Sequence, residues 1–264
     1  MTEPSTPPAR HVRAAFGRAA ATYDDAARVQ REICADLLTL AHQHAPGTTE
    51  RFLDAGCGTG RGAAEALAWL HPTETFALDF APEMLARCDA ARWHHRLCAD
   101  LQAIPLPNAS VDVIWSSLAV QWCAPDRALA EMARILRPGG RAFVATLGPG
   151  TLHELRHAFA AVDDARHVIA FHPAATWGDS ATAAGLTVDA LKLQPRAATA
   201  PDLRRLLRDI KAIGAHAVGD GRRRTPLGKA AWRTLQARYE PFRRTDGLLP
   251  ATYDVILLAL RKPQ

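Results

Sequence analysis

Apolar and polar residues follow two different periods along this chain, and the two periods alternate over residues 51–147. Short apolar runs, typical of buried strands, are separated by stretches with the three- to four-residue apolar spacing of helices. The expected strands span 51–56, 74–80, 96–100, 111–117 and 141–147, and the expected helices 61–70, 82–91 and 125–136. Such alternation predicts an α/β fold, a mostly parallel sheet with helices on both faces.

The flanking segments extend this pattern in both directions. After residue 150 we expect helices at 151–162 and 174–184, a strand at 187–193, amphipathic helices at 201–217 and 226–240, and an aliphatic last strand at 252–260. Before the sheet, apolar residues from Val12 to Leu40 recur at helical spacing, with a break near Tyr23. We interpret this N-terminal segment as a lid, and a simple packing helix is the alternative.

The stretch Phe52–Gly60 predicts a strand that runs into a glycine loop and then into a helix. Gly56, Gly58 and Gly60 allow positive φ angles and leave no Cβ between the backbone and a ligand. The free N–H groups of the following helix face the same spot. A plain strand-to-helix connection is the alternative, so the loop alone does not establish a binding site.

Three acids stand at the ends of three successive expected strands. Asp54, directly before the glycine loop, would repel a pyrophosphate but suits an ammonium or sulfonium group, which disfavours NAD and ATP. Asp79 stands where nucleotide-binding units place an acid on the ribose hydroxyls, and Asp100 can accept a hydrogen bond from an adenine amino group. Ligands of such sheets bind beyond the carboxyl ends of the strands. The acids and Ser116 are therefore expected to surround one nucleoside site.

Composition sets the broad class of protein. The 264 residues, 48% of them hydrophobic, fit one large domain or a domain with an elaboration. No apolar run approaches the ~20 residues of a membrane span, and the polar, Pro-rich start lacks the apolar segment of a signal peptide. We therefore expect a cytoplasmic protein without a membrane partner. The five cysteines lack metal-ligand spacing and fit reduced thiols better than disulfides, so no metal site is expected.

The net charge of +5 is unevenly distributed. Residues 196–244 contain 13 Lys and Arg against 4 Asp and Glu, a formal charge of +9, so the rest of the chain carries −4. A local basic surface predicts an acidic partner, and a solvated helix face is the alternative. Nucleic acid is not the expected partner, because the sequence shows no recognition helix, aromatic stacking platform or zinc module.

Several of these motifs resemble known families. Asp54–Gly60, Asp79, Asp100 and Leu136–Gly140 resemble the motifs of class I S-adenosylmethionine-dependent methyltransferases over about residues 50–147. Other segments resemble the malonyl-acyl carrier protein O-methyltransferase family of biotin synthesis: Phe16–Ala20 with Tyr23, Ser116–Trp122, Gly148–Leu152, Leu207–Ala215 and Leu249–Asp254. Two positions depart from that family, which usually has Asn at Ser117 and commonly Leu at Ala251.

The resemblance implies an architecture for the whole chain. It implies a class I methyltransferase fold, Rossmann-like, with a seven-stranded, mostly parallel sheet whose last strand lies antiparallel between the fifth and the sixth. The implied parts are a disordered tail (1–10), a helical lid (11–45), a cofactor-binding core (46–195), a basic helical insertion on the substrate side (196–248) and the last core strand (249–264).

The resemblance also implies ligands and site residues. The implied cofactor is S-adenosylmethionine, bound by Asp54, Gly56, Gly58, Gly60, Asp79, Asp100, Leu101 and Ser116. The implied catalytic residue is Tyr23, whose hydroxyl would contact the reacting carboxylate; packing is its alternative role. The implied substrate and carrier contacts are Phe16, Gln121, Trp122, Arg208, Lys211, Arg222, Arg223 and Arg224. The partner would be acyl carrier protein loaded with malonate, or malonyl-coenzyme A.

The chemistry of this reaction is compatible with these residues. The free carboxylate of a malonyl thioester is already a nucleophile at neutral pH, so its methylation needs positioning more than a strong base. Two alternatives stay open. One is a class I methyltransferase for a free small molecule, such as a quinone precursor or a small carboxylic acid, which should be indifferent to the charge of the basic insertion. The other is a non-catalytic module that binds S-adenosylmethionine or RNA.

Overall fold

The computed structural model describes residues 9–20, 28–44, 47–212 and 227–264. Within these described ranges, the helices α1 (Ala9–Ala19) and α3 (Arg28–Gln43) precede the first strand. The central part then alternates strands with helices: β1 (Arg51–Ala55), α4 (Ala64–Leu70), β2 (Glu74–Asp79), α5 (Pro82–Leu85), β3 (His95–Cys98), β4 (Val111–Ser117), the 3-10 helix η1 (Val120–Trp122), α6 (Pro125–Ile135) and β5 (Leu136–Leu147). The alternation expected from the sequence is confirmed.

The remaining elements return to the sheet only in part. They are α7 (His153–Phe159), α8 (Ala174–Ala183), β6 (Thr187–Leu193), β7 (Arg196–Ala200), α9 (Leu203–Ala212), α10 (Lys229–Tyr239), the 3-10 helix η2 (Glu240–Phe242), β8 (Leu249–Tyr253) and β9 (Val255–Arg261). No helix in the described ranges is long and apolar enough to cross a membrane.

Seven strands form the main sheet in the order β3-β2-β1-β4-β5-β9-β6. The strands β1 to β5 run parallel, and β9 runs antiparallel to both of its neighbours, β5 and β6. The predicted fold class is confirmed, including the antiparallel last strand between the fifth and sixth strands. Because β1 pairs with both β2 and β4, Asp54 stands in register with Ala77 on one side and Trp115 on the other.

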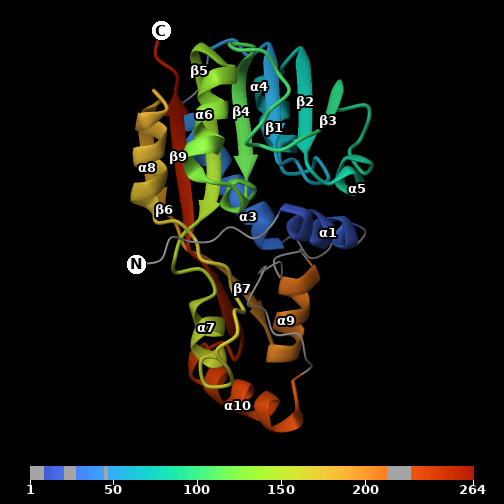
Figure 1. Cartoon of the computed structure of the whole chain (residues 1–264), viewed down its shortest axis with the longest axis vertical. Coiled ribbons are helices and arrows are strands. Elements are labelled where there is room, and N and C mark those ends of the chain that lie inside the picture. Colours follow the sequence, from blue (N-terminus) through green and yellow to red (C-terminus); the bar gives the residue numbers. More distant parts are fainter. Residues whose placement is uncertain (1–8, 21–27, 45–46, 213–226) are drawn as a thin grey trace.

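Apolar residues cover both faces of this sheet, which explains the continuous apolar runs of its strands. One face buries Leu53 and Ile114 against α6 and α8, and the other buries Phe52 and Val113 against α3 and α4. Figure 1 shows the same layering, with α6 and α8 on the near side of the sheet and α3 behind it. Successive side chains of a strand point to opposite faces, so each strand residue belongs to one of these two layers.

A second apolar cluster lies beyond the carboxyl ends of the parallel strands. We call this region, made of α7, α9, α10 and the two-stranded sheet β7-β8, the helical subdomain (Figure 1). Its core combines residues from all five elements, among them Leu155, Ala200, Leu206, Leu235 and Leu249. The sequence indicated α9 and α10 here but not the pairing of β7 with β8, nor the packing of α7 against α10.

Polar contacts hold α7 against β8 within the helical subdomain and fix the two segments that connect the subdomain to the sheet. The carboxylate of Glu154, which is buried, accepts a hydrogen bond from the Thr252 backbone N–H at 3.2 Å. The Asp254 carboxylate accepts from the Gly150 N–H at 2.8 Å, and the Asp254 N–H donates to Thr151 Oγ1 at 3.1 Å. These bonds fix the angle at which the chain leaves the sheet after β5 and re-enters it at β9.

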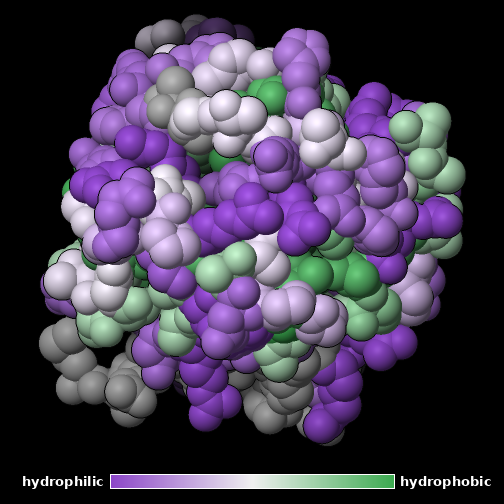
Figure 2. All heavy atoms as spheres, turned by 90° about the horizontal axis from the view of Figure 1, so that it is seen from above, coloured by the Kyte–Doolittle hydropathy of each residue, from purple (hydrophilic) through white to green (hydrophobic). Residues whose placement is uncertain are grey.

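The two ends of the sheet differ in what covers them. At the amino end of the strands, seen from above in Figure 2, the surface is mostly hydrophilic with small hydrophobic groups scattered over it. The carboxyl end faces α1 and the helical subdomain (Figure 1).

Candidate active site

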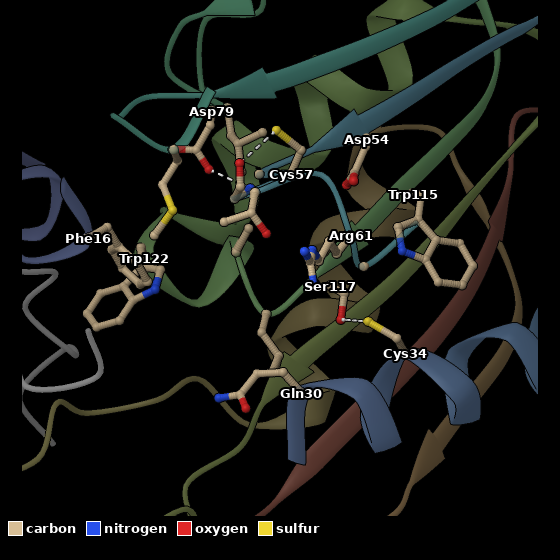
Figure 3. Close-up of a pocket in the computed structure, with 18 of the residues that line it drawn as sticks. Phe16, Gln30, Cys34, Asp54, Cys57, Arg61, Asp79, Trp115, Ser117 and Trp122 are labelled. Carbon is tan, nitrogen blue, oxygen red and sulfur yellow. Dashed lines mark hydrogen bonds between the residues drawn. The ribbon is translucent and has the colours of Figure 1, made fainter. Parts of the chain in front are cut away.

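A cavity of about 270 Å³ lies at the carboxyl ends of β1, β2 and β4. Its walls come from α1 and α3, from the loop after β1 together with α4, and from the segments that follow β2, β3 and β4. Figure 3 shows its lining with Asp79, Phe16 and Trp122 towards one end, and Asp54, Trp115, Ser117 and Cys34 towards the other. The position agrees with the rule that ligands of such sheets bind at this edge.

The glycine loop supplies the floor of the cavity. Gly56 adopts a φ of 84°, and a Cβ at this position would lie 2.1 Å from the Cβ of Ala119, so only glycine fits. Gly58 also has a positive φ, 55°, and lines the cavity. Gly60 does not line it; a Cβ there would lie 2.5 Å from the indole nitrogen of Trp93. The third glycine therefore serves close packing beneath the loop.

Two buried carboxylates line the cavity where the sequence placed them. Asp79 accepts hydrogen bonds from the N–H groups of Gly58, at 2.9 Å, and Ala81, at 2.8 Å. Burial raises the pKa of Asp79 although these N–H groups lower it, and burial together with the nearby Cys88 and Asp79 raises the pKa of Asp54 well above its ordinary value. A ligand with a positive charge would relieve the cost of keeping both groups ionised.

The segment after β3 provides another side of the cavity. Asp100 lies two residues beyond the end of β3, is exposed, and accepts a hydrogen bond from the Gln102 N–H at 2.9 Å. Leu101 is buried, and both residues line the cavity. A planar apolar group with hydrogen-bonding edges fits between such a leucine and an acid.

Ser116, like Gly60, is a predicted cofactor residue that does not line the cavity. Its side chain is fully buried on the α6 face of β4, and its hydroxyl donates to the Ala55 carbonyl at 2.7 Å. The next residue, Ser117, lines the cavity and accepts a hydrogen bond from the Cys34 thiol at 3.3 Å. Ser116 and Ser117 are adjacent on β4, and adjacent side chains of a strand point to opposite faces of the sheet. The prediction was therefore displaced by one residue.

The predicted substrate residues are divided between two places. Phe16 of α1 and Trp122 of η1 both line the cavity and meet edge to face, with ring centroids 5.7 Å apart. Gln121 is not part of the lining and donates to the Leu118 carbonyl at 2.6 Å. Arg208 and Lys211 are exposed on α9, outside the cavity. The remaining calls, Tyr23, Arg222, Arg223 and Arg224, lie outside the described residues.

The cavity also has a wall that the sequence did not indicate. α3 contributes Gln30, Arg31 and Cys34, and Arg61 and Trp115 complete this side. Burial raises the pKa of the Cys34 thiol to about 11, so the group stays protonated near neutrality. The apolar spacing of α3 predicts which of its residues pack against the sheet. It does not predict which of its polar residues line the cavity.

Taken together, the lining fits a nucleoside that carries a positive charge. Gly56 and Gly58 bring the backbone of the loop to the cavity, Asp79 presents carboxylate oxygens at the end of β2, and Asp54 adds a second buried acid. Acids in these positions oppose a phosphate but favour an ammonium or sulfonium group. The arrangement can hold and orient such a cofactor, and Val12 and Phe16 of α1 add apolar surface to the lining.

Comparisons with known proteins agree with this chemistry. Residues 53–144 match a family model described as a methyltransferase domain. The malonyl-[acyl-carrier protein] O-methyltransferase of Dechloromonas aromatica is 45% identical over 97% of this chain and 95% of its own length. The biotin biosynthesis bifunctional protein BioHC of Cellvibrio japonicus is 38% identical over 96% of this chain, which spans 50% of that protein.

A solved structure gives the same fold at low sequence identity. The geranyl diphosphate C-methyltransferase of Streptomyces coelicolor, in a complex that contains S-adenosyl-L-homocysteine, superimposes with a TM-score of 0.52 at 14% identity, covering 86% of this chain and 75% of that one. The fold and the methyltransferase domain define a class I S-adenosylmethionine-dependent methyltransferase. Within that class, the chain belongs to the malonyl-[acyl-carrier protein] O-methyltransferase family.

Proposed function

We propose that this protein transfers a methyl group from S-adenosylmethionine to the free carboxylate of a malonyl group on acyl carrier protein, in the synthesis of biotin. The observation that carries the proposal is the 45% identity to a malonyl-[acyl-carrier protein] O-methyltransferase over 97% of the chain. That match extends beyond the methyltransferase domain at 53–144 and includes the helical subdomain. A substrate-specific region is therefore shared as well as the fold.

The cofactor residues follow from the lining of the cavity. Asp79 would accept hydrogen bonds from the ribose hydroxyls, and Asp100 and Leu101 would contact the adenine. Asp54 would face the positively charged end of S-adenosylmethionine. Gly56 and Gly58 leave the backbone open to the ligand. S-adenosylmethionine supplies an electrophilic methyl group when bound. The contribution of the protein is to orient this methyl group and to keep water from it.

The acceptor needs little chemical activation. Its carboxylate is ionised at neutral pH, so the site has to hold one oxygen in line with the methyl group without removing a proton. Phe16 and Trp122 close the cavity beside Phe80 with apolar surface. The role of Tyr23 as a hydroxyl contact for the carboxylate stays a prediction. Equal turnover by the parent and by Tyr23→Phe at saturating substrate would return Tyr23 to a packing role.

The carrier would dock on the helical subdomain. α9 buries Leu203, Leu206 and Ile210 and presents the opposite, basic side to solvent, with exposed Arg204, Arg205, Arg208 and Lys211. In the view of Figure 1, α9 lies below α1, whose residues Val12 and Phe16 line the cavity. Acyl carrier proteins are acidic, so this face would steer the carrier and speed its association in a salt-dependent way. Arg222, Arg223 and Arg224, which follow α9 in the sequence and lie outside the described residues, are predicted to take part.

The five cysteines bear on the cellular location that we propose. All five are free thiols, and the thiols of Cys57 and Cys88 share a hydrogen bond at 3.9 Å without forming a disulfide. Neighbouring thiols of this kind persist in a reducing compartment. We therefore place the reaction in the cytoplasm.

Mass spectrometry of the carrier tests the proposed reaction directly. Malonyl-acyl carrier protein incubated with the enzyme and S-adenosylmethionine should gain the mass of one methyl group, and acetyl-acyl carrier protein should not. Methylation of a free carboxylic acid with no reaction on the carrier would favour a small-molecule enzyme. Cofactor binding without transfer to any carboxylate would favour a non-catalytic module.

A further inference from the structure

Four buried indole nitrogens have no hydrogen-bond partner among the described residues: those of Trp93, Trp115, Trp122 and Trp177. Trp93 packs beneath Gly60, and Trp177 belongs to the apolar layer under α8. Neither lines the cavity, whereas Trp115 and Trp122 do. An unpaired buried donor costs free energy that a ligand recovers only where it can reach the group. A ligand in the cavity can therefore reach the unpaired N–H groups of Trp115 and Trp122, but not those of Trp93 and Trp177.

Trp115 is the more constrained of these two. Its side chain is 1% exposed, and it stands on β4 in register with Asp54. Figure 3 shows its nitrogen facing the cavity, on the side where the Arg61 guanidinium and the Ser117 hydroxyl also lie. An indole nitrogen donates and never accepts. This end of the cavity therefore presents a fixed donor beside a cationic side chain.

We propose that Trp115 Nε1, with Arg61 beside it, forms a carboxylate-binding subsite at the Asp54 end of the cavity. The N–H donor and the guanidinium both select an acceptor that carries negative charge. The adjacent Asp54 repels a doubly charged phosphate more strongly than a carboxylate with a single charge. Glu65 also lines the cavity and, with Asp54, raises the pKa of Cys34 at this end. Two acids thus stand near the Trp115 donor and the Arg61 cation, and these mixed charges match a carboxylate that lies next to a positively charged group.

Two carboxylates in the proposed reaction have this chemistry. One is the α-carboxylate of S-adenosylmethionine, and the other is the malonyl carboxylate that receives the methyl group. The choice between them rests on the proposed function, whereas the subsite itself rests on Trp115, Arg61 and Asp54. Binding measurements that require no methyl transfer keep the two questions apart.

The substitution Trp115→Phe removes the N–H and keeps a large aromatic side chain. A hydrogen bond to a charged group corresponds to an affinity change of about 10- to 100-fold. The readouts are calorimetric titrations with S-adenosylmethionine, with decarboxylated S-adenosylmethionine, and with malonyl- and acetyl-acyl carrier protein on enzyme saturated with S-adenosylhomocysteine. Trp177→Phe is the matched control, because Trp177 is equally buried and unpaired on the opposite face of the sheet.

Two results support the subsite. A loss with S-adenosylmethionine that is absent with its decarboxylated analogue assigns the subsite to the cofactor. A loss with malonyl carrier that is absent with acetyl carrier assigns it to the acceptor. Unchanged binding of all four ligands, or equal losses within each pair, overturns the proposal. If Trp115→Phe does not fold, the same four titrations are made with Arg61→Gln. The same outcomes then support or overturn the proposed subsite. If the protein does not methylate malonyl-acyl carrier protein, the proposed function is refuted. The titrations with S-adenosylmethionine and decarboxylated S-adenosylmethionine still test the subsite in that case.

Discussion

The sheet and the helical subdomain each have an apolar core, but they carry opposite charges in different places: acids line the cavity at the sheet, and basic residues of the subdomain face solvent. From the sheet come the acids Asp54, Asp79 and Asp100, all at strand ends and all lining the cavity. From the helical subdomain come the exposed Arg208 and Lys211 of α9, which lie outside it. The difference suggests that the sheet fixes the cofactor and that the subdomain selects the partner. Four changes test this division.

The largest effect is expected at the floor of the cavity. Gly56→Ala should abolish cofactor binding and lower the free energy of unfolding by roughly 3 kcal/mol or more, because the new Cβ would overlap Ala119. Gly185→Ala is the control, since Gly185 has a similar φ of 81° and nothing within 4 Å. It should lose about 1–2 kcal/mol of stability and keep full affinity. Calorimetry and chemical denaturation measure both quantities, and normal binding by Gly56→Ala would refute the assigned floor.

Removing Asp79, the acid at the end of β2, should have a smaller effect on cofactor binding than the Gly56→Ala substitution. Asp79→Ala is expected to weaken S-adenosylmethionine binding by roughly 1.5–3 kcal/mol, the loss that follows when a charged acceptor is removed. Asp89 bonds the N–H two residues ahead, Ala91, just as Asp79 bonds Ala81, but it does not line the cavity. Asp89→Ala should therefore bind normally in the same titration. Equal affinities for Asp79→Ala and the parent would remove Asp79 from the cofactor site.

Charge reversal on α9 tests the other half of the comparison. Arg208→Glu with Lys211→Glu should raise KM for malonyl-acyl carrier protein severalfold and flatten its salt dependence, with kcat unchanged. The same reversal at Arg222, Arg223 and Arg224 extends the test beyond the described residues. Arg233→Glu with Arg238→Glu on α10 makes an equal charge change farther from α1 (Figure 1). Steady-state kinetics at several salt concentrations would count against docking if the α9 and α10 pairs lost activity equally.

The smallest effect concerns stability and pH. Burial raises the pKa of Asp54, so its ionised form destabilises the folded protein at neutral pH, and Asp54→Asn should raise the melting temperature by a few degrees. The gain should shrink as pH falls through the raised pKa, because the parent carboxyl then becomes neutral as well. Thermal melts across this pH range check the sign. A melting temperature that falls in the variant at neutral pH would mean that the charge is compensated without a ligand.

The sequence predicted the sheet better than it predicted the walls of the cavity. Asp54 and Asp79 were found because an acid that ends an apolar run is visible in the pattern and because parallel strands end at one edge. The choice of Ser116 over Ser117 failed because β4 is buried on both faces, so its residues give no polar alternation that sets the phase. Gln30 and Cys34 were missed because only tertiary packing turns that side of α3 towards the cavity.

The helical subdomain was the harder region for a related reason. β7 is short, and Pro250 in β8 reads as a strand breaker, although a strand at the edge of a two-stranded sheet tolerates it. The expected helix at 82–91 is also shorter, since α5 ends at Leu85. In both places the local sequence preference is weak and long-range contacts decide the conformation.

The segment Leu249–Arg261 sets an order of events during synthesis. Its first half, β8, is the partner of β7, and its second half, β9, is the strand that joins β6 to β5. Residues 187–200 leave the ribosome well before either partner has been made. The small sheet of the subdomain therefore cannot close until residue 253 has emerged, and the outer edge of the main sheet cannot close until residue 261 has emerged. The parallel strands β1 to β5 pair with one another without β8 or β9. This part of the sheet can therefore assemble during synthesis, before the C-terminal strands that complete the sheet and the helical subdomain have been made.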